Sequence, residues 1–174
     1  DLGHHGPVRI VPFKPRHAPG FFVLNRRWLA EHDLWEAPHA EELSDPSALI
    51  TGRGGRIYVA ERRGVVAGTC AVVPGASEAM EIRWLAVDPD WQRLGIGRRL
   101  LTRCAGYARR HGAPKVIAST SSRLSTGLRL YRKFGFVDAV PPPGRRAPID
   151  DVYMELELAS AAEPLRLIHS VTRS

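Results

Sequence analysis

A strand-like run joined to a helical run by a glycine-containing turn is the most constraining feature of this chain. The apolar run EIRWLAV begins at Glu81 and stops at an Asp-Pro pair, and a helical pattern starts near Gly95 and Gly97. Glycine leaves no side chain between backbone and ligand, and the first turn of a helix carries unpaired N–H groups. The segment therefore predicts a strand–turn–helix unit that binds phosphate. A dinucleotide-binding motif is not indicated, because leucine occupies position 100, where its third glycine would stand.

A second segment, LYRKFGF at 130–136, closes the next predicted helix. Together with the turn that contains Gln92, Gly95 and Gly97, it resembles the Gcn5-related N-acetyltransferase (GNAT) superfamily. The resemblance extends over residues 8–158.

The resemblance implies an α/β (α+β) fold of the GNAT type. Its sheet is mixed and mostly antiparallel, with helices on both faces, and two parallel strands splay apart to admit the pantetheine arm of coenzyme A. We expect residues 1–158 to form one acetyltransferase domain and residues 159–174 to form a C-terminal tail. Because the sequence begins at Asp1, an upstream segment is compatible with it.

The hydrophobic periodicity predicts the order of elements. Strands are expected over 8–13, 56–61, 65–73, 79–87, 115–120 and 151–158, and helices over 21–32, 39–43, from the Gly95 turn to Arg110, and from Leu124 to a cap at Gly135. The first helix should turn Phe22 and Leu29 inward, with Trp28 beside them, and 52–55 should be a loop. The strand–helix–strand crossover makes the strands near Glu81 and Lys115 parallel neighbours.

Composition excludes several classes of protein. The net charge is +7, but the basic residues are scattered in pairs, which disfavours nucleic-acid binding and suits a polyanionic cofactor. Cys70 and Cys104 lie in apolar segments without metal-site neighbours, so both are expected to be buried thiols and no metal is expected. No apolar run of about 18 residues occurs, which argues against a membrane span and against secretion. The expected location is cytoplasmic.

The resemblance also implies the roles of individual residues. Tyr131 falls where the family places the acid that protonates the coenzyme A thiolate, and Glu81 matches the strand position of the general base in the histone-acetylating branch. Arg83 lies two residues further on and shares the strand face of Glu81 unless a bulge intervenes. A neighbouring cation would lower the pKa of the Glu81 carboxylate and so weaken it as a base. The cofactor-binding positions are Leu85, Ala86 and Val87 for the pantetheine, and Gln92, Arg93, Leu94, Gly95, Ile96, Gly97 and Arg98 for the diphosphate.

Other assignments remain open. Rival bases are Asp150, Asp151, Glu155, His32 and His39. At the position where the family commonly has an asparagine, seven residues before the tyrosine, this chain has Leu124, so the hydrogen bond to the cofactor arm must come from elsewhere.

The expected activity is N-acetyl transfer from acetyl-CoA to a primary amine, in a ternary complex without a covalent enzyme intermediate. The acceptor is a small-molecule or peptide amine, and a homodimer is compatible with the resemblance. Three alternatives stand beside it: a longer acyl donor, a non-catalytic acyl-CoA sensor, and an interaction module that retains only the fold. The acidic residues of the variable region are either a solvated helix face or a rim that attracts an amine; they are Glu31, Asp33, Glu36, Glu41 and Glu42.

Overall fold

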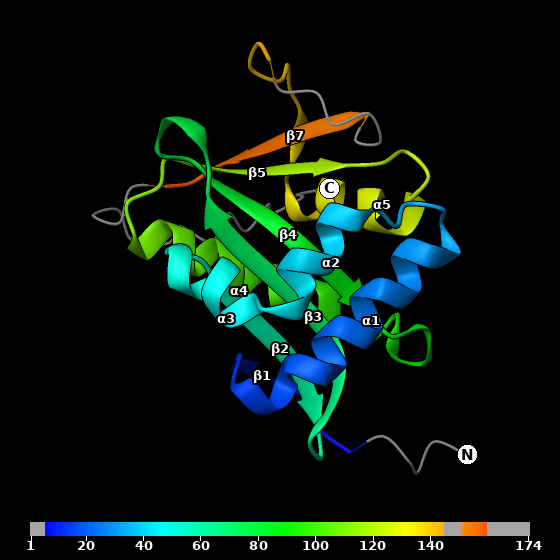
Figure 1. Ribbon diagram of the computed structural model, residues 1–174. Helices are drawn as coiled ribbons and strands as arrows, with labels where there is room; N and C mark the ends of the chain where they lie inside the picture. The colour runs from blue at the N-terminus through cyan, green and yellow to red at the C-terminus, as the bar shows by residue number, and fades with distance from the viewer. Residues whose placement is uncertain (1–5, 145–150, 160–174) are drawn as a thin grey trace, which may run out of the picture.

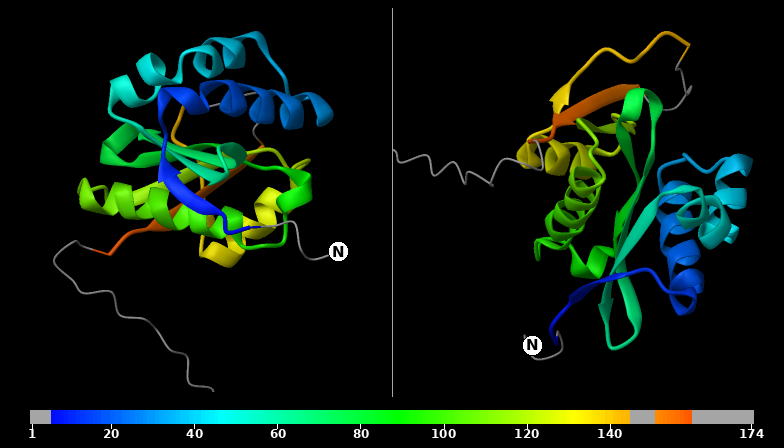
Figure 2. Two further views of the ribbon diagram at one scale, coloured as in Figure 1. Left: turned by 90° about the horizontal axis from the view of Figure 1, so that it is seen from below. Right: turned by 90° about the vertical axis from the view of Figure 1, so that its left-hand side faces the viewer.

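The computed structural model describes residues 6–144 and 151–159, which form a seven-stranded sheet with helices on both faces (Figures 1 and 2). The strands are β1 (Arg9–Pro12), β2 (Arg56–Arg62), β3 (Val65–Pro74), β4 (Met80–Val87), β5 (Lys115–Thr120), β6 (Val137–Asp138) and β7 (Val152–Glu157). The α-helices are α1 (Ala18–Glu31), α2 (Ala37–Ser44), α3 (Pro46–Leu49), α4 (Ile96–Arg110) and α5 (Ser125–Phe134). Short 3-10 turns are η2 (Pro15–His17), η3 (Thr51–Arg53), η4 (Ala76–Glu78) and η5 (Pro89–Trp91).

The sheet has the order β1-β2-β3-β4-β5-β7-β6. Strands β2, β3 and β4 are antiparallel neighbours, and β4 and β5 are parallel across the α4 crossover. Both arrangements confirm the fold class expected from the sequence. The hairpin between β2 and β3 turns through Arg63 and Gly64, whose φ angles of 47° and 79° suit the tight turns that join antiparallel strands.

The two larger apolar cores of the domain lie on opposite faces of the sheet, and a small third cluster forms around Ala79, Ile117 and Tyr153. Helices α4 and α5 cover the first, where Leu100, Leu101 and Cys104 of α4 pack on the sheet with less than 2% of their surface exposed. Helices α1 and α2 cover the opposite face (Figure 2), where Phe21 and Leu43 pack against β2 and β3. Because both faces are buried, the central strands are apolar nearly throughout rather than alternating.

Two helices begin earlier than the sequence pattern indicated. Helix α1 starts at Ala18 rather than at residue 21, and α2 starts at Ala37 rather than at residue 39. Each carries a proline, Pro19 or Pro38, in its first turn. Proline is tolerated there because the first N–H groups of a helix have no intrahelical partner.

Three further details go beyond or differ from the expectations drawn from the sequence. Phe22 packs on the core as expected but is only half-buried, against Trp35, whereas Phe21 is the fully buried aromatic residue of α1. The expected loop at 52–55 overlaps η3, and the short strand β6 was not anticipated. A two-residue strand has too little periodicity to be detected from sequence alone.

Of the helices in the described ranges, none combines the length and apolar character needed to cross a bilayer. Most of the tail expected from residue 159 onward lies outside the described residues.

Candidate active site

Strands β4 and β5 separate partway along their length, and this separation creates the site. Their parallel pairing covers only Met80 to Ile82 on β4 and Val116 to Ala118 on β5. Beyond Ile82, β4 still pairs with β3, while the end of β5 pairs with β7 (Figure 1). The edge of β4 from Arg83 to Val87 therefore has no neighbouring strand of β5 to occupy its backbone groups.

A cleft of about 1490 Å³ passes through this gap. One wall comes from α1, α2 and the segment between them, and the other comes from the 92–98 turn and α5. The cleft therefore opens on both faces of the sheet. The half lined by α1 and α2 is called the acceptor half below, and the half lined by the turn and α5 is called the cofactor half.

A β-bulge changes which side chains at the end of β4 face each side of the sheet. Between two paired positions, β4 advances from Arg83 to Ala86 while β3 advances only from Thr69 to Ala71, so β4 has one extra residue. Trp84 sits at the bulge with φ of 54°, which is an outlier for a bulky side chain. As a result, the Leu85 side chain packs against the core beneath α4, and Trp84 packs on the opposite face of the sheet. In a strand without the bulge, Trp84 would face the α4 side instead.

The strained Trp84 is held from several directions. Its indole Nε1 donates to Glu42 at 2.7 Å, and its carbonyl accepts from the Thr69 hydroxyl at 2.8 Å. Its ring makes edge contacts with Phe21 and His39. Backbone strain fixed this firmly is typical of functional sites.

The position of the bulge also determines whether Glu81 and Arg83 lie on the same face of β4. The bulge lies after both residues, so by strand alternation they share the face that carries α1 and α2. The Arg83 guanidinium donates to Glu42 at 2.8 Å. Glu81 is 7% exposed and lines the cleft.

The turn before α4 forms an N–H concavity in the cofactor half. Arg93 and Gly95 have φ angles of 68° and 74°, and Gly95 is the N-cap of α4. Turns with such angles gather successive N–H groups on one side and bind anions. Gln92 is exposed but still anchors the turn, because its Nε2 donates to the Val87 carbonyl at 3.2 Å.

The remaining residues of the turn divide between the surface and the interior. Leu94 is 55% exposed, while Ile96 and Gly97 are buried beneath the turn. Gly97 allows α4 and α5 to approach closely, since a Cβ there would lie 2.6 Å from Leu130 Cδ2.

Basic side chains surround this turn. Four line the cleft and form no ion pair with the residues that the structure describes: Arg93, Arg98, Arg129 and Lys133. Arg99 is different, because it points out of the cleft and donates to the Val8 carbonyl at 3.0 Å. The group of four supplies the positive charge that a diphosphate requires.

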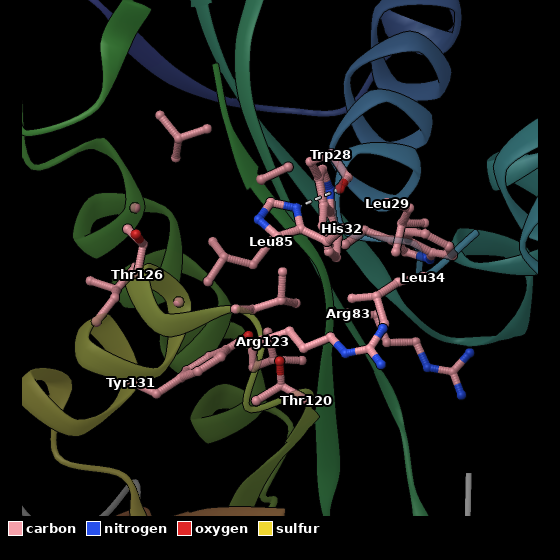
Figure 3. Close-up of a pocket in the computed structure, with 18 of the residues that line it drawn as sticks. Trp28, Leu29, His32, Leu34, Arg83, Leu85, Thr120, Arg123, Thr126 and Tyr131 are labelled. Atoms are coloured by element: carbon pink, nitrogen blue, oxygen red, sulfur yellow. Dashed lines mark hydrogen bonds between the residues drawn. The ribbon is translucent and has the colours of Figure 1, made fainter. Parts of the chain in front are cut away.

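Tyr131 lines the cleft from α5 (Figure 3). It is 6% exposed and packs edge-on against Phe136, with 5.2 Å between ring centroids. Its helix, α5, ends at Gly135, whose φ of 118° requires glycine. The LYRKFGF segment is therefore both a helix end and a wall of the cleft.

The two histidines of the acceptor half carry their protons on opposite ring atoms. His32 Nδ1 lies 2.8 Å from the Trp28 carbonyl, which only accepts, so Nδ1 holds the proton and the neutral ring has its lone pair on Nε2. His39 Nδ1 accepts from the Glu36 N–H at 3.2 Å, so its Nε2 is a donor. Only His32 presents a basic nitrogen by this test.

The rival carboxylates are engaged elsewhere. Asp151 accepts from the N–H and hydroxyl of Ser122 at 2.7 and 2.5 Å, and these bonds lower its pKa, which makes it a weaker base. Glu155 pairs with Lys115 at 3.0 Å and does not line the cleft. Asp150 lies outside the described residues.

Position 124 departs from the family pattern, and the structure places Leu124 at the N-cap of α5, lining the cleft. The serine beside it, Ser122, ties the β5–α5 loop to Asp151 instead.

The cysteines are inert in this fold. Cys70 and Cys104 are both free and 0% exposed, as expected from the sequence, and burial, followed by the neighbouring Cys70, raises the pKa of the Cys104 thiol. Over 6–144 and 151–159, no three His, Cys, Asp or Glu side chains group as metal ligands.

Sequence reasoning missed Asn25, a buried polar residue on α1. Its Nδ2 donates to the Phe21 carbonyl at 2.9 Å and to the Thr69 hydroxyl at 3.0 Å, and its Oδ1 accepts from Trp28 Nε1 at 3.0 Å. It thereby connects the acceptor-half Trp28 to the strand that supports the bulge. No pattern marks such a residue, because asparagine in a helix normally faces solvent.

Comparison with known proteins gives the same picture. Residues 53–138 match the family model described as "Acetyltransferase (GNAT) domain". The L-amino acid N-acyltransferase MnaT of Escherichia coli is 31% identical over 119 residues, which is 62% of this chain and 67% of that protein. N-acetyltransferase family 8 member 3 of Rattus norvegicus is 28% identical over 66% of this chain, which spans only 54% of the rat protein.

Solved structures share the fold. A GNAT-family acetyltransferase from Staphylococcus aureus Mu50 has a TM-score of 0.80 at 14% identity and covers 88% of this chain and 100% of its own. The yncA protein of Salmonella typhimurium, solved with its cofactor acetyl-CoA, has a TM-score of 0.70 at 24% identity and covers 91% of this chain and 98% of its own.

Proposed function

The chain belongs to the GNAT acetyltransferase family, and we propose that it moves an acetyl group from acetyl-CoA to a primary amine in a ternary complex. The observation that carries the proposal is the cleft through the gap between β4 and β5. It lets a thioester enter from the cofactor half and an amine enter from the acceptor half, so that both reach the same stretch of β4. Such placement replaces an encounter in solution by a reaction between fixed neighbours.

The cofactor half supports coenzyme A with backbone and charge. The N–H concavity from Arg93 to Gly95 and the start of α4 would hold the diphosphate, with Arg98 and Lys133 neutralising it. The edge of β4 at Leu85, Ala86 and Val87, which β5 does not cover, would hold the pantetheine. In the proposed reaction a backbone N–H near Leu85 stabilises the negative charge that develops on the acetyl oxygen.

Proton transfers complete the reaction. The amine nitrogen bonds to the acetyl carbon, the carbon–sulfur bond breaks, and the amine loses one proton while the thiolate gains one. Tyr131 is proposed to supply the thiolate with its proton; a thiol pKa of about 8.5 and a phenol pKa of about 10 make this transfer only slightly unfavourable.

Two residues compete for the role of proton acceptor. Glu81 is the residue that the resemblance implies, and it is buried at the cleft. His32 is favoured by a separate observation, the bond from its Nδ1 to Trp28, which leaves Nε2 basic in the acceptor half. A positioned base contributes about a hundredfold to ten-thousandfold, so either assignment is measurable.

Calorimetric titration with acetyl-CoA tests the proposal, and the chain offers a matched pair of variants. Gly95 and Gly112 both have φ of 74° and open space around the missing Cβ, so Gly95→Ala and Gly112→Ala impose the same backbone strain, about 1–2 kcal/mol. Only Gly95 lines the cleft.

We expect the unaltered protein to bind acetyl-CoA with micromolar affinity. Gly95→Ala should weaken this binding tenfold or more, about 1.4 kcal/mol, whereas Gly112→Ala should retain it. An amine screen monitored by thiol release then tests turnover. Absence of binding in the unaltered protein would refute the proposal. Binding without turnover of any amine would support the acyl-CoA sensor instead.

A further inference from the structure

Arg123 occupies an unusual place in the acceptor half of the cleft. It lies in the loop between β5 and α5, and its side chain extends into the cleft near Thr120 and Arg83 (Figure 3). Hydrogen bonds anchor this loop, because the Arg123 N–H donates to Ser121 Oγ at 3.2 Å and the adjacent Ser122 makes two bonds to Asp151. The guanidinium therefore extends from a hydrogen-bonded turn.

The other cations of this half are already neutralised. Arg83 pairs with Glu42 at 2.8 Å, and Arg27 pairs with Asp88 at 3.3 Å. Arg123 forms no ion pair within 4 Å among residues 6–144 and 151–159. Hydrogen bonds from Ser122, and to a smaller extent the charge of Arg123, lower the pKa of Asp151, whose carboxylate oxygens are both bonded to Ser122.

The acidic groups of the acceptor half lie on other elements. Glu31 and Glu36 are exposed on the helical rim of the cleft. Asp151 also lines the cleft beside the Arg123 loop, but its oxygens are held by Ser122. The carboxylates of the rim, which attract an ammonium group, therefore lie on other elements than Arg123. A ligand with both charges matches this separation.

Apolar side chains form the remaining wall. Trp28, Leu29 and Leu34 line the acceptor half (Figure 3), and Trp84 continues the surface toward the bulge. An apolar substituent on the acceptor would displace water from this wall.

We infer that the acceptor is a small amine that carries a carboxylate and an apolar substituent, and that Arg123 binds the carboxylate. This inference rests on the proposed function, because it assigns the substrate class of the same cleft. A guanidinium binds a carboxylate through two parallel N–H···O bonds, which suits an oriented ligand better than a single charge does.

Product binding tests the inference without requiring turnover. The probes are N-acetyl-L-leucine, N-acetyl-L-methionine and N-acetyl-L-phenylalanine, each beside its carboxamide, titrated by calorimetry into the protein saturated with coenzyme A. Each amide has nearly the shape of its acid but lacks the charge, and acetylation removes differences in amine pKa.

At least one acid is expected to bind about tenfold to a hundredfold more tightly than its amide, as a charge-assisted hydrogen bond implies. Arg123→Gln should abolish that preference and leave the Kd for coenzyme A unchanged. Arg53→Gln is the matched control, because Arg53 is exposed in η3 and lies outside the cleft, so it removes the same net charge without touching the site.

Three results would overturn the inference while coenzyme A still binds: amides that bind as tightly as acids, a preference that survives Arg123→Gln, or no binding of any probe. Failure of coenzyme A itself to bind is a different result, because it refutes the proposed function and removes the inference with it.

Discussion

The contact between Gly97 and Leu130 gives a quantitative prediction about how α4 and α5 pack. A Cβ at position 97 would lie 2.6 Å from Leu130 Cδ2, whereas apolar carbons are in contact at about 3.5–4.0 Å. Gly97→Ala therefore requires a displacement of roughly 1 Å in the α5 side chain or backbone. Overpacking of this kind costs about 1–3 kcal/mol.

The cost should depend on Leu130. In a Leu130→Ala background the overlapping methyl groups are absent, and alanine is a better helix former than glycine by about 0.5–1 kcal/mol. After this gain is subtracted from the overpacking cost, Gly97→Ala is expected to destabilise the unaltered chain by up to about 2.5 kcal/mol. When Leu130 is alanine, it should be neutral or slightly stabilising.

Urea unfolding of the four proteins at 25 °C measures this coupling, with m-values compared to check that only stability has changed. In thermal unfolding, the single variant should lose about 2–4 °C per kcal/mol for a chain of this size. Gly127→Ala is the control, because it lies in α5 with nothing within 4 Å of the added Cβ and should not destabilise.

Equal costs of Gly97→Ala in both backgrounds would refute the reasoning, because Leu130 would then not be the reason for glycine. The coupling also bears on function. If a Gly97 variant lost both stability and acetyl-CoA binding, the loss of binding could follow from disturbed packing of α4 against α5. The binding test therefore uses Gly95 instead.

Other predictions concern the proposed proton transfers and an ion cluster away from the cleft. Tyr131→Phe preserves ring packing but should lower kcat about a hundredfold or more, with acetyl-CoA binding by calorimetry unchanged; full activity would exclude Tyr131 as the acid. His32→Gln and Glu81→Gln should differ in the rate of single-turnover thiol release. The base is the residue whose replacement lowers that rate about a hundredfold or more, and small losses of rate in both variants would exclude both residues. Hydrogen bonds from Arg16 and His17 lower the pKa of Glu61 from 4.5 to about 2, so its stabilisation is complete above about pH 4.5 and disappears as the pH falls toward 2. Glu61→Gln should therefore cost about 1.5–3 kcal/mol in urea unfolding at pH 7, and a cost that is as large near pH 3 would contradict this assignment.

Local sequence signals were sufficient for the elements that build the cofactor half. The glycines of the turn, the apolar stripe of α4 and the cap at Gly135 are each dictated by backbone geometry and by contacts within a few residues. The parallel pairing of β4 with β5 followed from the crossover between them, which is also a local constraint.

Tertiary structure decided what local signals could not. The bulge at Trp84 depends on Glu42 and Thr69, which are distant in sequence, so strand periodicity alone could not place Leu85 on the α4-side core. The choice between His32 and His39 depended on which ring nitrogen meets a carbonyl and which meets an N–H.

The sequence by itself thus determined which segments fold and which family chemistry the chain resembles, because propensity, caps and turns act over short distances. Only the tertiary structure decided which charges in the cleft are neutralised. Arg83 and Arg123 are equivalent as sequence, yet Glu42 satisfies the first and no described carboxylate pairs with the second. Ion pairing depends on distances in space between elements that are far apart in the chain. The proposed recognition of a carboxylate rests on the difference in pairing between Arg83 and Arg123.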